Sequence, residues 1–171
     1  MSFINDFLPQ DFHGDSRVWI YQAITPFEDQ DLPWIQGELE QFARGWTAHS
    51  LPVKGFAGVF LKQFLIFLAD ETQSGVSGCS IDSSVRVVKM IESRTGIRCF
   101  DRNQVAFWLE GQVSLIPLGE IGDALTQGKI GPHSLFFNNL VASKSELQNH
   151  WLVPVEESWL KERVRESSLH G

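Results

Sequence analysis

The chain has 171 residues, of which 43% are hydrophobic, 12% aromatic and 20% charged. This composition provides enough apolar surface for a sizeable core and excludes disordered, fibrous and coiled-coil proteins. The formal net charge is −7, and the sequence contains no run of basic residues. Because such a surface repels phosphate backbones and anionic lipids, nucleic acids and membrane surfaces are not expected partners.

The length matches one domain, and we expect a single globular domain over residues 1–171, with an N-terminal extension (1–15) and a polar tail (166–171). The acidic segment Met1–Asp15 lacks the pattern of a signal peptide. No apolar run reaches the roughly 18 residues that a membrane helix requires. We therefore expect no membrane insertion and a cytoplasmic location, where cysteine thiols stay reduced.

The first half of the chain alternates strand and helix patterns. A strand is predicted at Arg17–Ala23, which is apolar on both faces. The capping pattern Thr25–Glu28 and the helical spacing that follows predict a helix ending near Trp46. Pro33 is tolerated only in a first turn, so a helix start nearer Asp29 is the alternative.

Two hairpins and a second helix follow. The runs Phe56–Leu61 and Phe64–Asp70 predict the first hairpin. A helix that opens at Ser80 and closes at Gly96 carries Ile81, Val85, Val88 and Ile91 on one face. The runs Gln104–Leu109 and Gln112–Pro117 flank Glu110-Gly111 and predict the second hairpin.

The last third of the chain predicts shorter elements. A short helix is expected around Glu120–Gln127, and Leu135–Val141 fits either a strand or a buried helical piece. The capping box Ser143–Glu146 predicts a helix reaching about His150. A last helix is expected at Glu157–Arg165.

The order β-α-β-β-α-β over residues 17–109 is the split βαβ pattern of ferredoxin-like folds. We therefore expect an α+β fold with two layers and a mainly antiparallel sheet, extended by one more hairpin strand and C-terminal helices. In this topology the start of the first strand, the loop after the first helix and the loop before the second helix leave the same end of the sheet. Arg17, His49 and Cys79 are then neighbours.

The segment Ser77–Ser84 holds the candidate site, because Cys79 stands at the predicted start of a helix. The partial positive charge of a helix N-terminus stabilises a thiolate. A catalytic site would use Cys79 as nucleophile, His49 as base and Asp82 to orient the base. A ligand site would instead use Arg17, Gly78, Ser80 and Ser83, whose charge and backbone N–H groups suit a small anion.

A purely structural interpretation is open for each of these residues. Small residues around Cys79 also describe a tight turn and a helix cap. His49 and Asp82 can simply complement helix dipoles. Cys99 is interpreted as core packing. The scattered histidines show no metal-ligand spacing, so no metal and no other cofactor is expected.

The chain resembles a family of small bacterial proteins, common in Bacteroidetes, many of which carry the label "ABC transporter ATPase". The resemblance covers almost the whole length and rests on these segments: Ser16–Gln22, Trp46–His49, Ser77–Val85, Phe137–Val141 and Trp151–Trp159. It implies kinship and no particular activity. ATP hydrolysis of the transporter type requires the G-x-x-x-x-G-K-[ST] phosphate loop, which this sequence lacks. We therefore expect no ATPase activity.

Three classes of function follow from the sequence. The favoured class is a binding or adaptor domain for a small anionic ligand, with its site around Cys79. The second is a thiol-dependent enzyme that uses Cys79 and His49. The third is an interaction subunit that binds a protein partner or a second copy of the chain.

Overall fold

The computed structural model describes residues 3–72 and 81–162. It is an α+β protein, in which helices accompany antiparallel sheets. Its residues fall into two compact units: unit 1 comprises Met1–Asp101 and Val141–Gln148, and unit 2 comprises Arg102–Leu140 and Asn149–Gly171. The expectation of a single domain over the whole chain stays a prediction.

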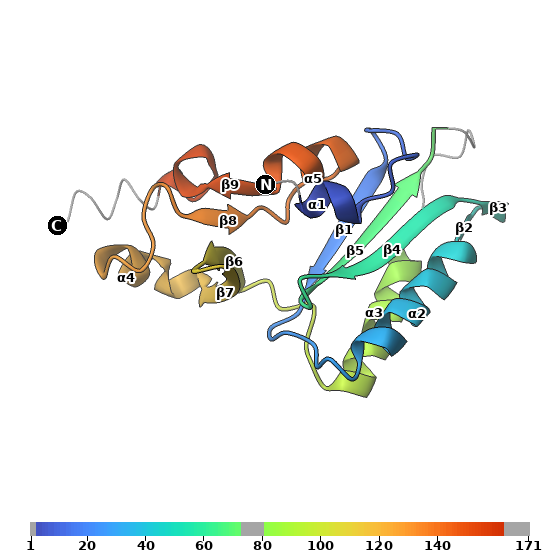
Figure 1. Ribbon diagram of the computed structural model, residues 1–171, viewed down its shortest axis with the longest axis horizontal. Coiled ribbons are helices and arrows are strands. Elements are labelled where there is room, and N and C mark those ends of the chain that lie inside the picture. Colours follow the sequence, from blue (N-terminus) through green and yellow to red (C-terminus); the bar gives the residue numbers. More distant parts are fainter. Residues whose placement is uncertain (1–2, 73–80, 163–171) are drawn as a thin grey trace. The chain divides into compact units, whose positions relative to one another are not determined.

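Unit 1 contains a three-stranded antiparallel sheet in the order β1-β5-β4 (Figure 1). Its strands are β1 (Arg17–Gln22), β4 (Lys54–Phe60) and β5 (Phe64–Asp70). The central strand is β5, and every one of its residues is buried. The predicted hairpin between β4 and β5 is confirmed, and its turn places Leu61 and Lys62 at positive φ.

Two long helices cover one face of this sheet, α2 (Leu32–Arg44) and α3 (Ile81–Thr95) (Figure 1). The capping prediction at Thr25–Glu28 is wrong, because α2 begins after Asp31 with Pro33 in its first turn. The preceding segment instead pairs with the β4–β5 turn, where the Phe27 N–H donates to the Lys62 carbonyl at 2.7 Å. The end of α3 is as predicted, with Gly96 at φ 72.

The N-terminal extension contains a helix that the sequence analysis did not predict, α1 (Phe3–Phe7). Its Phe7 ring lies 4.9 Å from the Phe60 ring and 5.4 Å from the Phe56 ring. Since Phe56 and Phe60 alternate with the residues of β4 that face α2 and α3, α1 covers the opposite face (Figure 1). The two-layer expectation is therefore too simple for unit 1.

The fourth strand of the predicted ferredoxin-like sheet does not join β1. That segment, β6 (Gln104–Leu109), belongs to the sheet of unit 2. Residues 142 and 143 lie beside β1 instead: the Val18 N–H donates to the Ala142 carbonyl at 3.0 Å, and Arg17 bridges Ser143. The ferredoxin-like topology is not confirmed, because a segment distant in sequence satisfies part of the free edge of β1.

Unit 2 contains a four-stranded antiparallel sheet in the order β7-β6-β8-β9. Besides β6, its strands are β7 (Gln112–Pro117), β8 (Leu135–Phe137) and β9 (Leu152–Pro154). The short 3-10 turn Leu118–Glu120 leads into α4 (Ile121–Thr126). Residues Phe107, Ile121 and Phe136 contribute to the core between α4 and the sheet.

The predicted capping box at Ser143 is confirmed at α5 (Lys144–His150). The Glu146 N–H donates to Ser143 Oγ at 3.2 Å, and Glu146 Oε2 accepts from the Ala142 N–H at 2.7 Å. The segment predicted as a last helix begins in a 3-10 turn, Val155–Glu157, and its end lies outside the described residues. Within the described ranges, no helix is both long and apolar enough to cross a membrane.

Candidate functional site

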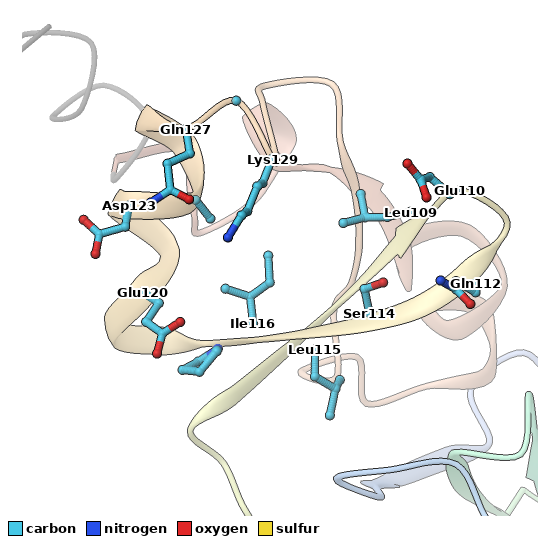
Figure 2. Close-up of a pocket in the computed structure, with 13 residues that line it drawn as sticks. Leu109, Glu110, Gln112, Ser114, Leu115, Ile116, Glu120, Asp123, Gln127 and Lys129 are labelled. Carbon is cyan, nitrogen blue, oxygen red and sulfur yellow. The ribbon is translucent and has the colours of Figure 1, made fainter.

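An open pocket of about 660 Å³ lies in unit 2 between the β6–β7 hairpin and α4 (Figure 2). We call it the β7–α4 pocket. It has 13 lining residues, which all belong to unit 2. Its apolar lining residues come from the hairpin and the helix: Leu109, Leu115, Ile116, Pro117 and Ala124.

The hairpin fixes one wall of the pocket. The two-residue turn Glu110-Gly111 has both residues at positive φ, 51° and 80°, which is the geometry that joins two twisted strands most directly. This turn sets a register in which Ser114 lies opposite Phe107 and Ile116 lies opposite Val105. Since Val105, Phe107 and Ile116 pack in the core with α4, this register turns Ser114 and Ile116 toward the helix.

The end of α4 fixes the opposite wall. Gly128 follows the C-cap residue Gln127 and adopts φ 69, and its N–H donates to the Leu125 carbonyl at 3.1 Å. The Lys129 N–H donates to the Ala124 carbonyl at 2.9 Å, which completes a Schellman motif. The chain therefore turns back, and the Lys129 side chain points into the pocket toward Ile116 (Figure 2).

Polar groups surround the apolar part of the pocket. Carboxylates come from three positions: Glu110 before β7, Glu120 after it and Asp123 on α4. Hydrogen-bonding side chains come from Gln112, Ser114 and Gln127. Lys129 is the only basic residue of the lining, and it forms no salt bridge with any residue in the described part of the chain.

No sequence motif points to this pocket. The hairpin and the short helix that form it are predicted separately, and both are confirmed. The lining residues have no motif, because they come from both sides of two turns and meet only after the helix packs on the sheet. The positive-φ glycines Gly111 and Gly128 are the one local signal, since they mark the two turns that form the walls.

Two of the sequence-predicted site residues lie in unit 1, one at an end of the three-stranded sheet and the other in a separate two-stranded sheet. Arg17 is the first residue of β1, where its guanidinium lies 3.4 Å from Glu71 Oε1 and 4.7 Å from the Trp19 ring centroid. His49 occupies the turn of a small hairpin formed by β2 (Thr47–Ala48) and β3 (Leu51–Pro52), with its backbone at φ 49. No contact joins Arg17 to His49 among the interactions described.

The other predicted site residues lie between positions 78 and 83 of the sequence. Asp82 and Ser83 lie in its first turn, as expected. Gly78, Cys79 and Ser80 lie outside the described residues. The composite site of Cys79, His49 and Asp82 therefore stays a prediction, as does the anion site formed with Arg17.

A buried carboxylate organises the same end of the unit 1 sheet. Asp70 ends β5 with 2% of its surface exposed and accepts hydrogen bonds from the His13 N–H at 3.1 Å and the Thr72 hydroxyl at 2.6 Å. Burial raises its pKa, but these hydrogen bonds and the nearby Lys54 outweigh burial and lower the pKa below 3.8. Lys54 is also 3.0 Å from Asp11 Oδ2. These contacts tie the N-terminal segment to the sheet.

Cys99 behaves as the sequence analysis expects of a core residue. Its side chain is buried, and its thiol lies 3.6 Å from the Ile97 carbonyl. Burial and the negative charge of Glu92 raise the pKa of the thiol to about 12. Cys99 is therefore a packing group rather than a nucleophile at neutral pH.

The described residues contain no cluster of three or more His, Cys, Asp or Glu side chains that could hold a metal ion. No family model, no curated protein and no solved structure matches this chain.

Proposed function

We propose that this protein is a ligand-binding domain and that the β7–α4 pocket is its binding site. The observation that carries the proposal is the combination of an apolar floor with an inward-pointing ammonium group, that of Lys129 (Figure 2). Small-molecule sites combine apolar contacts, which provide affinity, with polar groups that fix orientation, and this lining has five apolar and seven polar or charged side chains.

The chemistry of the lining favours binding over catalysis. It provides carboxylates, amides, one hydroxyl and one ammonium group, and neither histidine nor cysteine is part of it. Nucleophilic catalysis would need a nucleophile within reach of a base that activates it. Charge recognition and hydrogen bonding need only the groups that are present.

The shape and charge of the pocket restrict the ligand. The apolar residues of the lining, among them Ile116 and Ala124, favour an aliphatic or aromatic group of the ligand. The outer ring of Glu110, Glu120 and Asp123 favours hydrogen-bond donors or positive charge at the ligand's periphery, and Lys129 favours an acceptor at its centre. The ligand we propose is therefore amphipathic, with an acceptor that lies over the apolar floor.

The other functional hypotheses stay predictions from the sequence. An anion site around Cys79 requires free positive charge near Arg17, whereas Arg17 and Lys54 already face the carboxylates of Glu71 and Asp11. This pairing reduces the local positive potential and favours the β7–α4 pocket as the primary site. The thiol-dependent enzyme and the cytoplasmic location likewise rest on sequence alone.

Chemical-shift mapping by NMR tests the proposal. The backbone amide signals of the full chain are recorded with three probes of different charge: N-acetyl-leucine amide, phenethylamine and 3-phenylpropionate. We expect saturable shifts in residues 109–129, and we expect the variant Ser114→Phe, which fills the pocket, to abolish them. The control variant Glu157→Gln, at an exposed position of unit 2 outside the lining, keeps them. Saturable shifts centred on Arg17 and His49 instead would favour the anion site and contradict the proposal.

A further inference from the structure

The strand β7, which forms one wall of the β7–α4 pocket, is one of the two edge strands of its sheet. In the β6–β7 register, the pair that closes the turn is Leu109 and Gln112. In a two-residue hairpin this closing pair exchanges hydrogen bonds, and the pairs alternate from there. The N–H and C=O groups of Val113 and Leu115 therefore point away from β6, toward the outer edge.

The outer edge of β7 differs from the edges of the unit 1 sheet. The N–H of Val59 on β4 donates to the Gln36 side chain at 3.2 Å, and the N–H of Val18 on β1 donates to the Ala142 carbonyl at 3.0 Å. In the described part of unit 2, no hydrogen-bond partner lies opposite the outward N–H and C=O groups of Val113 and Leu115. Each edge strand of the unit 1 sheet thus has a bonded N–H group of this kind, whereas among the described residues the outer edge of β7 has none.

The sequence of β7 has few of the features that protect an edge strand. Charged side chains and bulges usually prevent such a strand from pairing with another chain. The strand QVSLIP carries no charge, and its register with β6 is continuous. Only Pro117, at its last position, blocks extension of pairing.

The pocket lies along this edge. Its lining includes the consecutive residues Ser114, Leu115, Ile116 and Pro117, which alternate between the two faces of the sheet. The side chains of consecutive residues point to opposite faces of the sheet, so a pocket lined by consecutive residues must reach the edge of the strand. The pocket is therefore open to the backbone of β7 as well as to its inner face. An extended segment placed there would bond to the edge and insert a side chain beside α4.

We propose that the ligand of the β7–α4 pocket is an extended peptide segment that adds to β7 as a fifth strand. This inference rests on the proposed function and specifies its ligand. Main-chain hydrogen bonds to Val113 and Leu115 supply affinity, and an apolar side chain of the peptide enters the pocket over Ile116. The inward-pointing Lys129 donates to a peptide carbonyl above that side chain (Figure 2).

The charges at the two ends of β7 define the peptide further. Glu110 precedes the strand, Glu120 and Asp123 follow it, and all three line the pocket. The six residues of β7 span about 17 Å from first to last. A matching peptide has about six residues, with a basic residue at each end and apolar or β-branched residues between them. A basic peptide also complements the net charge of the whole chain, which is −7.

Fluorescence anisotropy with a synthetic peptide tests this inference. The probe is fluorescein-labelled Lys-Thr-Ile-Thr-Val-Lys-amide, titrated with the full chain at low salt. One control peptide has its central backbone nitrogens methylated, and the other has glutamate in place of both lysines. We expect saturable binding of the probe, with each control at least about tenfold weaker.

Matched variants of the protein locate the interaction. Glu120→Lys reverses an exposed charge at the end of β7 and should weaken binding about three- to tenfold, whereas Glu157→Lys, outside the lining, should leave it unchanged. Equal binding of the methylated and unmethylated peptides would overturn strand addition. Dimerisation at rising protein concentration, seen by sedimentation under conditions in which the peptide does not bind, would also overturn it, because a second copy would then be the occupant of the edge.

The comparison with small probes separates the two proposals. If N-acetyl-leucine amide shifts residues 109–129 while no peptide binds, the peptide inference fails and the binding pocket stands. If neither the small probes nor the peptide binds, both proposals fail.

Discussion

The hydroxyl of Tyr21 on β1 lies 2.8 Å from the hydroxyl of Ser84 on α3, and both side chains are buried. The contact joins the sheet of unit 1 to α3, which begins at Ile81. Because a buried hydroxyl without a partner is costly, this pair helps to fix the position of α3 on the sheet.

Replacing Tyr21 by phenylalanine should lower the free energy of unfolding by about 1 kcal/mol, because Ser84 loses a buried hydrogen-bond partner. Ser84→Ala should cost a similar amount. Urea unfolding of both single variants and the double variant measures the coupling. A double variant whose loss equals the sum of the single losses would show that the two hydroxyls do not interact.

The pH dependence of stability should reveal Asp70. Its pKa is lowered in the folded state, so its ionised form contributes stability above the unfolded pKa near 3.8, and this contribution is lost as the pH falls below that value. Asp70→Ala should lower the free energy of unfolding at pH 7 by about 3 kcal/mol, since it leaves the N–H groups of His13 and Thr72 without their acceptor.

Urea denaturation at pH 7 and pH 3 measures this effect. The difference in stability between wild type and Asp70→Ala should shrink at the lower pH. An undiminished difference would show that the charge of Asp70 contributes nothing and that only packing is lost.

The two cysteines should differ in reactivity. The pKa of about 12 keeps the Cys99 thiol protonated near neutral pH, and burial blocks access to it. We expect iodoacetamide to label Cys79 in the folded protein and to label Cys99 only after denaturation in urea. Mass spectrometry of the alkylated peptides measures both rates, and faster labelling of Cys99 in the folded protein would contradict its assignment to the core.

Two glycines provide a matched pair of substitutions. A Cβ at Gly55 on β4 would lie 2.8 Å from the Trp46 ring and 3.1 Å from the Ala43 carbonyl oxygen, so Gly55→Ala should destabilise the fold by about 1 to 3 kcal/mol. A Cβ at Gly37, within α2, would meet nothing within 4 Å. Gly37→Ala should stabilise the fold by about 0.5 to 1 kcal/mol, because alanine favours the helix. Thermal unfolding of the two variants should therefore give shifts of opposite sign, and shifts of equal sign would contradict this packing.

Elements with strong local signals could be predicted from the sequence. The turn Glu110-Gly111 specifies its hairpin because it joins two β-rich runs through residues at positive φ. Gly96 ends α3 for a similar local reason. The helix Phe3–Phe7 has too few residues to show a helical period, and its packing on Phe56 and Phe60 decides its position.

Long-range pairing could not be predicted in the same way. The strand Gln104–Leu109 has the correct bounds, but nothing in its own residues specifies whether β1 or β8 becomes its neighbour. The contact between Val18 and Ala142 joins segments more than a hundred residues apart, and no local pattern records it. The β7–α4 pocket was missed for the same reason, since packing between elements creates it.

Intermolecular nuclear Overhauser effects test the central claim, that the β7–α4 pocket binds ligand, most directly. With N-acetyl-leucine amide bound to the isotope-labelled protein, the leucine methyl groups should show these effects to the methyl groups of Ile116 and Ala124, which line the pocket. Saturable binding with effects only to side chains outside residues 109–129 would contradict the claim.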